Sequence, residues 1–145
     1  MSTHDFQNIL LELDHKDLVG ILKSDQRFSE QDFPNYTIDQ MGDHFLPETI
    51  DGAVFNYAVR PKYWEQLKQE FKKLLCTSDK KYSSLRKDLS EGTKTIVSSI
   101  AAVMATQFGV VAGVLMPFCA LLLIAALKLG KEAFCACTQL DIHIE

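Results

Sequence analysis

Residues Thr95 to Leu127 read TIVSSIAAVMATQFGVVAGVLMPFCALLLIAAL, and this stretch carries no charged side chain. Lys94 and Lys128 stand at its two ends. As one helix, its roughly 33 residues would measure about 50 Å, against about 30 Å for the hydrocarbon core of a bilayer. The stretch is therefore long enough to cross a membrane and too apolar to lie exposed in water.

The stretch is predicted to form either one long, bent helix or an interfacial helix followed by a membrane span. Pro117 is the expected cause of a bend, because its ring crowds the carbonyl of Gly113 and it lacks an N–H group. Residues 108–127 have the length of one crossing, whereas residues 96–107 measure only about 18 Å. The side chains expected in the span are Phe108, Leu115, Pro117, Leu121, Leu122, Leu123, Ile124 and Leu127.

Gly109 and Gly113 form a small-xxx-small pair, which Ala105 continues loosely. Small residues at this spacing let two membrane helices approach closely. These three residues are therefore the expected helix-packing positions, and a homo-oligomer is one form that the pattern allows.

Charge is distributed unevenly along the chain. Residues 1–59 hold roughly three basic and eleven acidic side chains, and residues 60–94 hold roughly ten basic and five acidic ones. A basic segment just before an apolar one favours contact with anionic lipid headgroups, here through Lys80, Lys81, Arg86, Lys87 and Lys94. The positive-inside rule then places the N-terminal part in the cytoplasm. The net charge of −4 argues against nucleic acid as a partner.

The predicted fold is all-α, with a helical head (residues 1–93), an apolar segment (94–128) and a short tail (129–145). The head's clearest helix covers Pro61–Cys76, with Trp64, Leu67, Phe71, Leu74 and Leu75 on one stripe. Helices are also expected before and after a break at residues 14–17, over residues 38–45, and around Tyr82, Leu85 and Leu89. Residues 47–58 favour a helix, with a strand over 53–59 as the alternative.

The four cysteines do not predict a disulfide framework, and Cys119 is expected to be a packing residue. Cys135 and Cys137 are one residue apart, which departs from the spacing of zinc and thioredoxin-like sites. No catalytic motif appears, and the sequence neighbours Asp14 and His15 would point apart on a helix. We therefore expect no metal, no cofactor and no enzymatic activity.

Two functional hypotheses follow. In the first, the chain is a small membrane-associated protein of bacterial type, whose head binds a protein partner and whose apolar helix anchors in or perturbs a lipid bilayer. Such a protein would act as a regulatory anchor or as an effector in a toxin or defence system. In the second, it is a cytoplasmic, all-helical interaction module whose apolar helix is its core or its dimer interface.

Overall fold

The computed structural model of the chain describes residues 10–45, 49–50, 53–54, 60–77, 80–82, 85 and 92–144. The fold class is all-α, as predicted. Within the described part, the strands are a two-residue antiparallel pair. The elements are α2 (His15–Lys23), α3 (Asp32–Asn35), α4 (Ile38–Phe45), β1 (Thr49–Ile50), β2 (Ala53–Val54), α5 (Arg60–Cys76), the 3-10 helix η1 (Lys80–Tyr82), α7 (Thr93–Phe108), α8 (Ala112–Leu129) and α9 (Lys131–Ala136).

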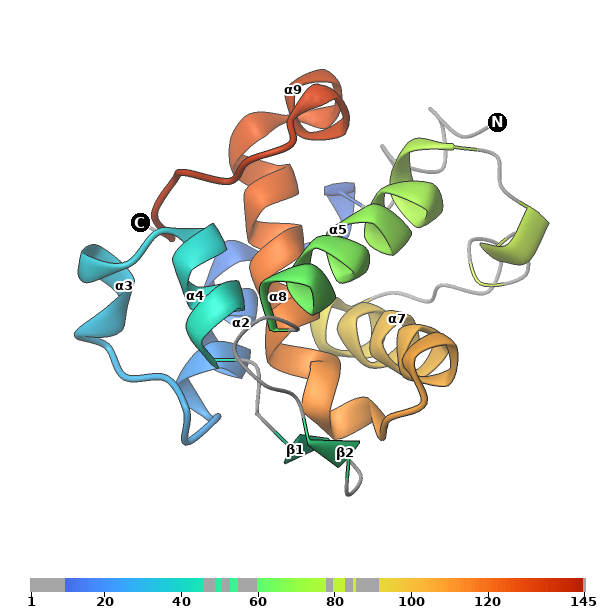
Figure 1. Ribbon diagram of the computed structural model, residues 1–145. Helices are drawn as coiled ribbons and strands as arrows, with labels where there is room; N and C mark the ends of the chain where they lie inside the picture. Colours follow the sequence, from blue (N-terminus) through green and yellow to red (C-terminus); the bar gives the residue numbers. More distant parts are fainter. Residues whose placement is uncertain are drawn as a thin grey trace.

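Helix α8 lies at the centre of the molecule, and α2, α4, α7 and α9 pack against it (Figure 1). Every side chain from Phe118 to Ala126 has an exposed fraction of 0%. Burying one leucine side chain of this kind stabilises the fold by about 2 kcal/mol. Among the described residues, α8 is the one helix long and apolar enough to cross a membrane, and 61% of it is buried inside the protein.

The apolar stretch is divided into a helical hairpin. Helix α7 ends at Phe108, and Gly109 takes a left-handed conformation with φ of 69°. The N–H groups of Gly109 and Val110 both bond to the carbonyl of Ala105, which closes the end of α7. The break therefore lies at Gly109, close to the predicted boundary between residues 107 and 108, and Pro117 lies inside α8. A single continuous helix over residues 95–127 is not what forms, because glycine at 109 permits the turn.

The helices around α8 contribute the apolar faces that their sequences predicted. The five apolar side chains of the α5 stripe are exposed by no more than 1%. Helix α2 begins at the predicted break, where the Asp14 side chain accepts a hydrogen bond from the N–H of Lys16 (2.9 Å).

Two local predictions differ from the structure or lie outside it. The helix favoured over residues 47–58 is wrong, because β1 and β2 pair there with Thr49 opposite Val54. The alternative strand over 53–59 includes β2, and its residues 55–59 lie outside the described part. The helix expected around Tyr82 is described as the short η1, while Leu89 lies outside the described residues.

Gly42 of α4 tests how tightly α4 and α5 are packed. A Cβ atom added at Gly42 would lie 2.1 Å from ring atoms of Trp64, whereas one added at Gly20 would meet nothing within 4 Å. We expect Gly42→Ala to lower the free energy of unfolding by about 1–3 kcal/mol through overpacking. Gly20→Ala should raise it by up to about 1 kcal/mol, because alanine is the better helix former. Urea denaturation of both variants measures the difference, and equal effects would contradict the tight contact.

Candidate functional site

The C-terminal segment, residues 138–144, is the part of the chain that sequence reasoning left without a role. Figure 1 shows it running from α9 back to α4, where the chain ends beside the N-terminus of that helix. The N–H of Ile38 donates to the carbonyl of Ile142 (2.8 Å), and the N–H of Asp39 donates to the carbonyl of Leu140 (3.0 Å). The segment therefore bonds two of the N–H groups that the first turn of a helix leaves without intrahelical partners.

The first turn of α4 also carries its own cap. The Thr37 hydroxyl accepts from the N–H of Gln40 (3.2 Å), and the Gln40 side chain accepts from the N–H of Thr37 (2.9 Å). This reciprocal arrangement is a capping box. Together, the capping box and the C-terminal segment provide acceptors for the N–H groups of residues 37–40. The N-terminus of α4 can therefore lie against the core.

Basic side chains bond to two more carbonyls of the segment. Lys68 donates to the carbonyl of Thr138 (3.2 Å). His15 Nε2 (3.0 Å) and Lys128 Nζ (3.1 Å) both bond to the carbonyl of Ile144. The carbonyls at 138, 140, 142 and 144 thus all have a partner on the body of the protein.

The side chains of the segment alternate between the core and solvent. Leu140 is 3% exposed and Ile144 is fully buried, while Ile142 packs partly against the core. Gln139 and Asp141 are exposed. This period of two is that of an extended strand with one buried face.

Asp39 is the polar centre of this site. Its Oδ1 atom accepts hydrogen bonds from Trp64 Nε1 (2.9 Å) and Lys68 Nζ (2.8 Å), and its Oδ2 atom accepts one from the N–H of Leu140 (2.8 Å). Lys68 also lies 2.5 Å from a carboxylate oxygen of Glu65. One carboxylate therefore joins α4, α5 and the C-terminal segment.

These contacts determine the protonation states of Asp39 and Lys68. Burial alone would raise the pKa of Asp39, but the hydrogen bonds from Lys68, Leu140 and Trp64 lower it below its ordinary value of 3.8. Burial would lower the pKa of Lys68, but its bonds to Asp39 and Glu65 raise it above 10.5. Both groups are therefore charged at neutral pH, as a buried ion pair requires.

An acidic hollow of about 550 Å³ lies beside this network. Four carboxylates line it, contributed by Asp39, Asp43, Glu65 and Asp141. The pKa of Asp43 is raised, first by burial and then by the charge of Asp39. Asp141 belongs to the C-terminal segment itself, so that segment adds a negative charge to a surface that is already acidic.

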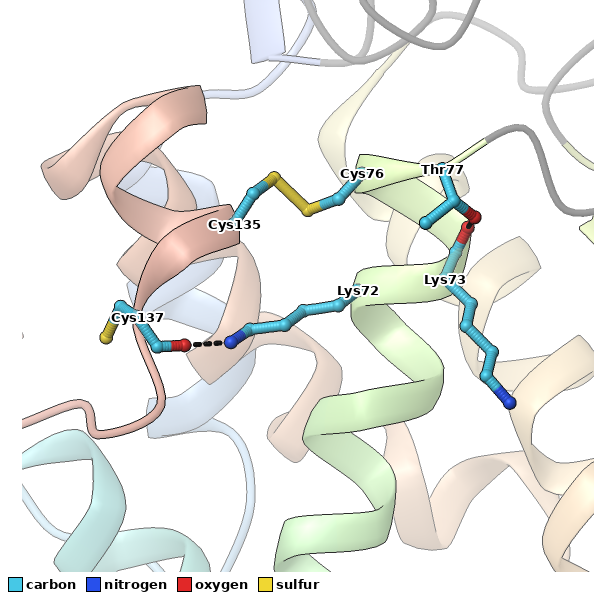
Figure 2. The surroundings of a disulfide bond; sticks show 6 residues. All are labelled: Lys72, Lys73, Cys76, Thr77, Cys135 and Cys137. Carbon is cyan, nitrogen blue, oxygen red and sulfur yellow. Dashed lines mark hydrogen bonds between the residues drawn. A yellow bond between two sulfur atoms is a disulfide. The ribbon is translucent and has the colours of Figure 1, made fainter.

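A disulfide between Cys76 and Cys135 joins the end of α5 to α9, immediately before the C-terminal segment (Figure 2). The sequence did not predict this pair, because its members are 59 residues apart. Cys137 is a free thiol that points away from the disulfide, and its carbonyl accepts a hydrogen bond from Lys72. Cys119 is buried, as predicted, and burial raises the pKa of its thiol to about 12.

The residues predicted to form a membrane span lie mostly inside the protein. Those at 115, 117 and 121–124 are buried in the core. Phe108 ends α7, and Leu127 lies in the last turn of α8; both are half-buried. In the folded monomer, this set is the core that the other helices enclose.

The predicted helix-packing and headgroup residues are scattered over several elements. Ala105 is buried in α7, while Gly109 and Gly113 are exposed and a Cβ atom on either would meet nothing within 4 Å. The packing of two helices through these glycines remains a prediction. Lys80 and Lys94 are exposed, and the side chains of Lys81, Arg86 and Lys87 lie outside the described part.

The described residues contain no group of three or more His, Cys, Asp or Glu side chains placed to hold a metal ion. Comparisons of the chain with protein-family models, with curated proteins and with solved structures found no match.

The alternation of Leu140, Ile142 and Ile144 with polar residues is the signal that could have predicted the docked segment. It is short, and nothing in the sequence says which surface such a strand contacts. The pairing of Asp39 with Lys68 is likewise not readable from spacing, because it joins two helices.

Asp39→Asn should lower the free energy of unfolding at pH 7 by about 1–3 kcal/mol, because it removes one of the two carboxylates paired with the buried Lys68. The folded-state pKa of Asp39 is lowered, so its stabilisation is present above about pH 4 and is lost as pH falls through the folded value. The difference between wild type and variant should therefore shrink toward pH 3. Denaturation from pH 3 to 7 measures this trend. Glu12→Gln, at an exposed carboxylate outside this hollow, is the matched control, and an Asp39→Asn effect independent of pH would contradict the role of the charge.

Proposed function

We propose that this chain is an all-helical protein-binding module that keeps its apolar helix inside its own fold. Two observations support the proposal: residues Phe118 to Ala126 of α8 have no exposed surface within a single chain, and the extended residues 138–144 dock beside α4 through main-chain hydrogen bonds, as a bound peptide would. A helix that is apolar on all sides is either a core helix or a membrane span, and here protein surrounds residues 117–126 of it.

The energetic cost of removing α8 from this setting supports the proposal. Withdrawing the helix would expose the apolar faces of α2, α4, α7 and α9 and the ring of Trp64 in α5, together with its own apolar surface. Folded domains are stable by only about 5–15 kcal/mol, and the burial of several leucine-sized side chains contributes a comparable amount. If α8 were a permanent membrane anchor, residues 1–93 would have to stay folded without it. The loss of this buried apolar surface means that they would not keep their present fold.

The first experiment is expression of the full chain, followed by a carbonate wash of the membranes and light scattering of the soluble fraction. We expect the protein in the soluble fraction, without detergent, as a species with the mass of one chain. Leu122→Lys, which places a charge at a fully buried position, should abolish the helical circular dichroism signal. Recovery of the wild type in the washed membranes, with a Leu122→Lys protein that is soluble and helical, would overturn the proposal.

A second candidate function is membrane association by the α7–α8 hairpin after the bundle opens. One observation favours it: the turn between the two helices is apolar and exposed, with Val111 58% exposed. No charged residue lies between Lys94 and Lys128. The turn and the helical segments beside it therefore carry no charge that would oppose their entry into a bilayer. With 16 and 18 residues, α7 and α8 would measure about 24 and 27 Å, close to the hydrocarbon thickness.

The role of the turn is tested with Val111→Asp and a matched control, Leu11→Asp. Both side chains are exposed, at 58% and 80%, so neither substitution should change the melting temperature by much. If the hairpin inserts turn-first, Val111→Asp should reduce dye leakage from phosphatidylserine-containing vesicles at least tenfold, since a charge in the bilayer costs about 3 kcal/mol. Leu11→Asp should leave leakage unchanged. Absence of leakage by the wild type, or equal leakage by both variants, would contradict this candidate.

A further inference from the structure

The C-terminal segment is held mainly through its backbone. Its carbonyls at residues 138, 140, 142 and 144 accept hydrogen bonds from Lys68, Asp39, Ile38, His15 and Lys128. Carbonyls are present in every peptide, so these donors would bond any extended chain in the same register. Recognition through the main chain, with specificity from alternate side chains, is the usual way in which proteins bind extended peptides.

We call the surface that holds residues 138–144 the groove; its hydrogen-bond donors belong to His15, Ile38, Asp39, Lys68 and Lys128. Side-chain recognition in this groove is confined to the apolar face. Leu140 and Ile144 enter the core beside α2, α4 and α8, and Ile142 between them is partly buried. Positions four residues apart in an extended chain are separated by about 13 Å. The groove therefore selects an extended segment with aliphatic side chains at three alternate positions.

The charge of the docked segment, residues 138–144, does not complement the charge of its surroundings. Its Asp141 lines the same hollow as Asp39, Asp43 and Glu65, where Lys68 bonds to Asp39 and Glu65. Burial and the negative charges of Asp39 and Glu65 raise the pKa of Asp43. A basic residue in place of Asp141 would replace repulsion by attraction at this point.

Departure of the segment would leave the rest of the fold attached. The disulfide pins α9 to α5 at Cys135, three residues before the segment begins (Figure 2). Lys68 keeps its ion pairs with Asp39 and Glu65 when Thr138 leaves. The N–H groups of Ile38 and Asp39 lie at a helix terminus, where water or another peptide can replace the lost carbonyls.

We propose that this groove is the partner-binding site of the module, that its ligand is an extended protein segment with alternating aliphatic side chains and a lysine or arginine between the first two, and that residues 138–144 are its intramolecular competitor. This inference rests on the proposed function as a protein-binding module. A segment of the same chain that occupies the groove at millimolar effective concentration keeps out weak ligands and yields to one with better complementarity.

The experiment uses three fluorescein-labelled octapeptides. The first has the sequence of residues 138–145, TQLDIHIE. The second carries the change Asp141→Lys, and the third adds serine in place of Leu140, Ile142 and Ile144. Fluorescence anisotropy is measured with the wild-type chain and with the double variant Leu140→Ala and Ile144→Ala, which weakens the resident segment and leaves the groove residues unchanged.

We expect the lysine peptide to bind the double variant roughly threefold to tenfold more tightly than the native peptide, and this ratio to fall toward one in 1 M salt. Binding of both peptides to the wild type should be weaker by up to about 100-fold, because the attached segment competes at millimolar effective concentration. The serine peptide should not bind either protein. Equal binding of the lysine and serine peptides, or a folded double variant that binds none of the three, overturns the proposal.

Hydrogen exchange of the wild type provides the second measurement, which does not depend on the double variant folding. The amide of Leu140 is held by Asp39, and it should lose protection when the lysine peptide is added at several millimolar. Unchanged protection at that concentration overturns the proposal. Either negative result, obtained with a soluble, monomeric wild type, rejects this groove while the module itself stands, whereas failure of the solubility test rejects the module.

Discussion

The structure depends on the exclusion of water from α8. This helix satisfies its own backbone hydrogen bonds but has no polar face to present to solvent, so every side of residues 117–126 must be covered by apolar groups. Helices α2, α4, α7 and α9 provide most of that cover, and Trp64 of α5 contacts Phe118. Ala120, Ala125 and Ala126 keep part of its surface narrow enough for neighbouring helices to approach closely. The surrounding helices are therefore arranged so that their apolar faces exclude water from α8.

Short polar connections between neighbouring elements keep this cover in place. The N–H of Asp14, before α2, donates to the hydroxyl of the buried Thr93 at the start of α7 (2.8 Å). Asp39 connects α4, α5 and the C-terminal segment through three hydrogen bonds. The disulfide adds a covalent link between α5 and α9, and closing a loop of its length reduces the entropy of the unfolded chain by about 4 kcal/mol in free-energy terms.

The two functional hypotheses share one physical property and differ in its use. An uncharged helical hairpin is stable in lipid and stable inside a shell of amphipathic helices, and the choice depends on which environment costs less. Within one chain, the shell is present and covers most of α8. The turn around Val111 is the apolar part of the hairpin that is exposed to solvent, next to the exposed Thr106 and Gln107 at the end of α7.

The sequence by itself determined the helical class, the position of the apolar stretch, the α5 stripe and the break before α2. These features follow from local periodicity and from capping residues, which act over one or two turns of helix. Only the tertiary structure decided that the apolar stretch turns at Gly109, that Cys76 pairs with Cys135, and that the alternating residues after Thr138 pack beside α4. Each of these joins residues far apart in the chain or depends on what fills the space around them. A run of apolar side chains indicates only that the run must be shielded from water. The tertiary packing decides whether lipid or other parts of the protein shield it.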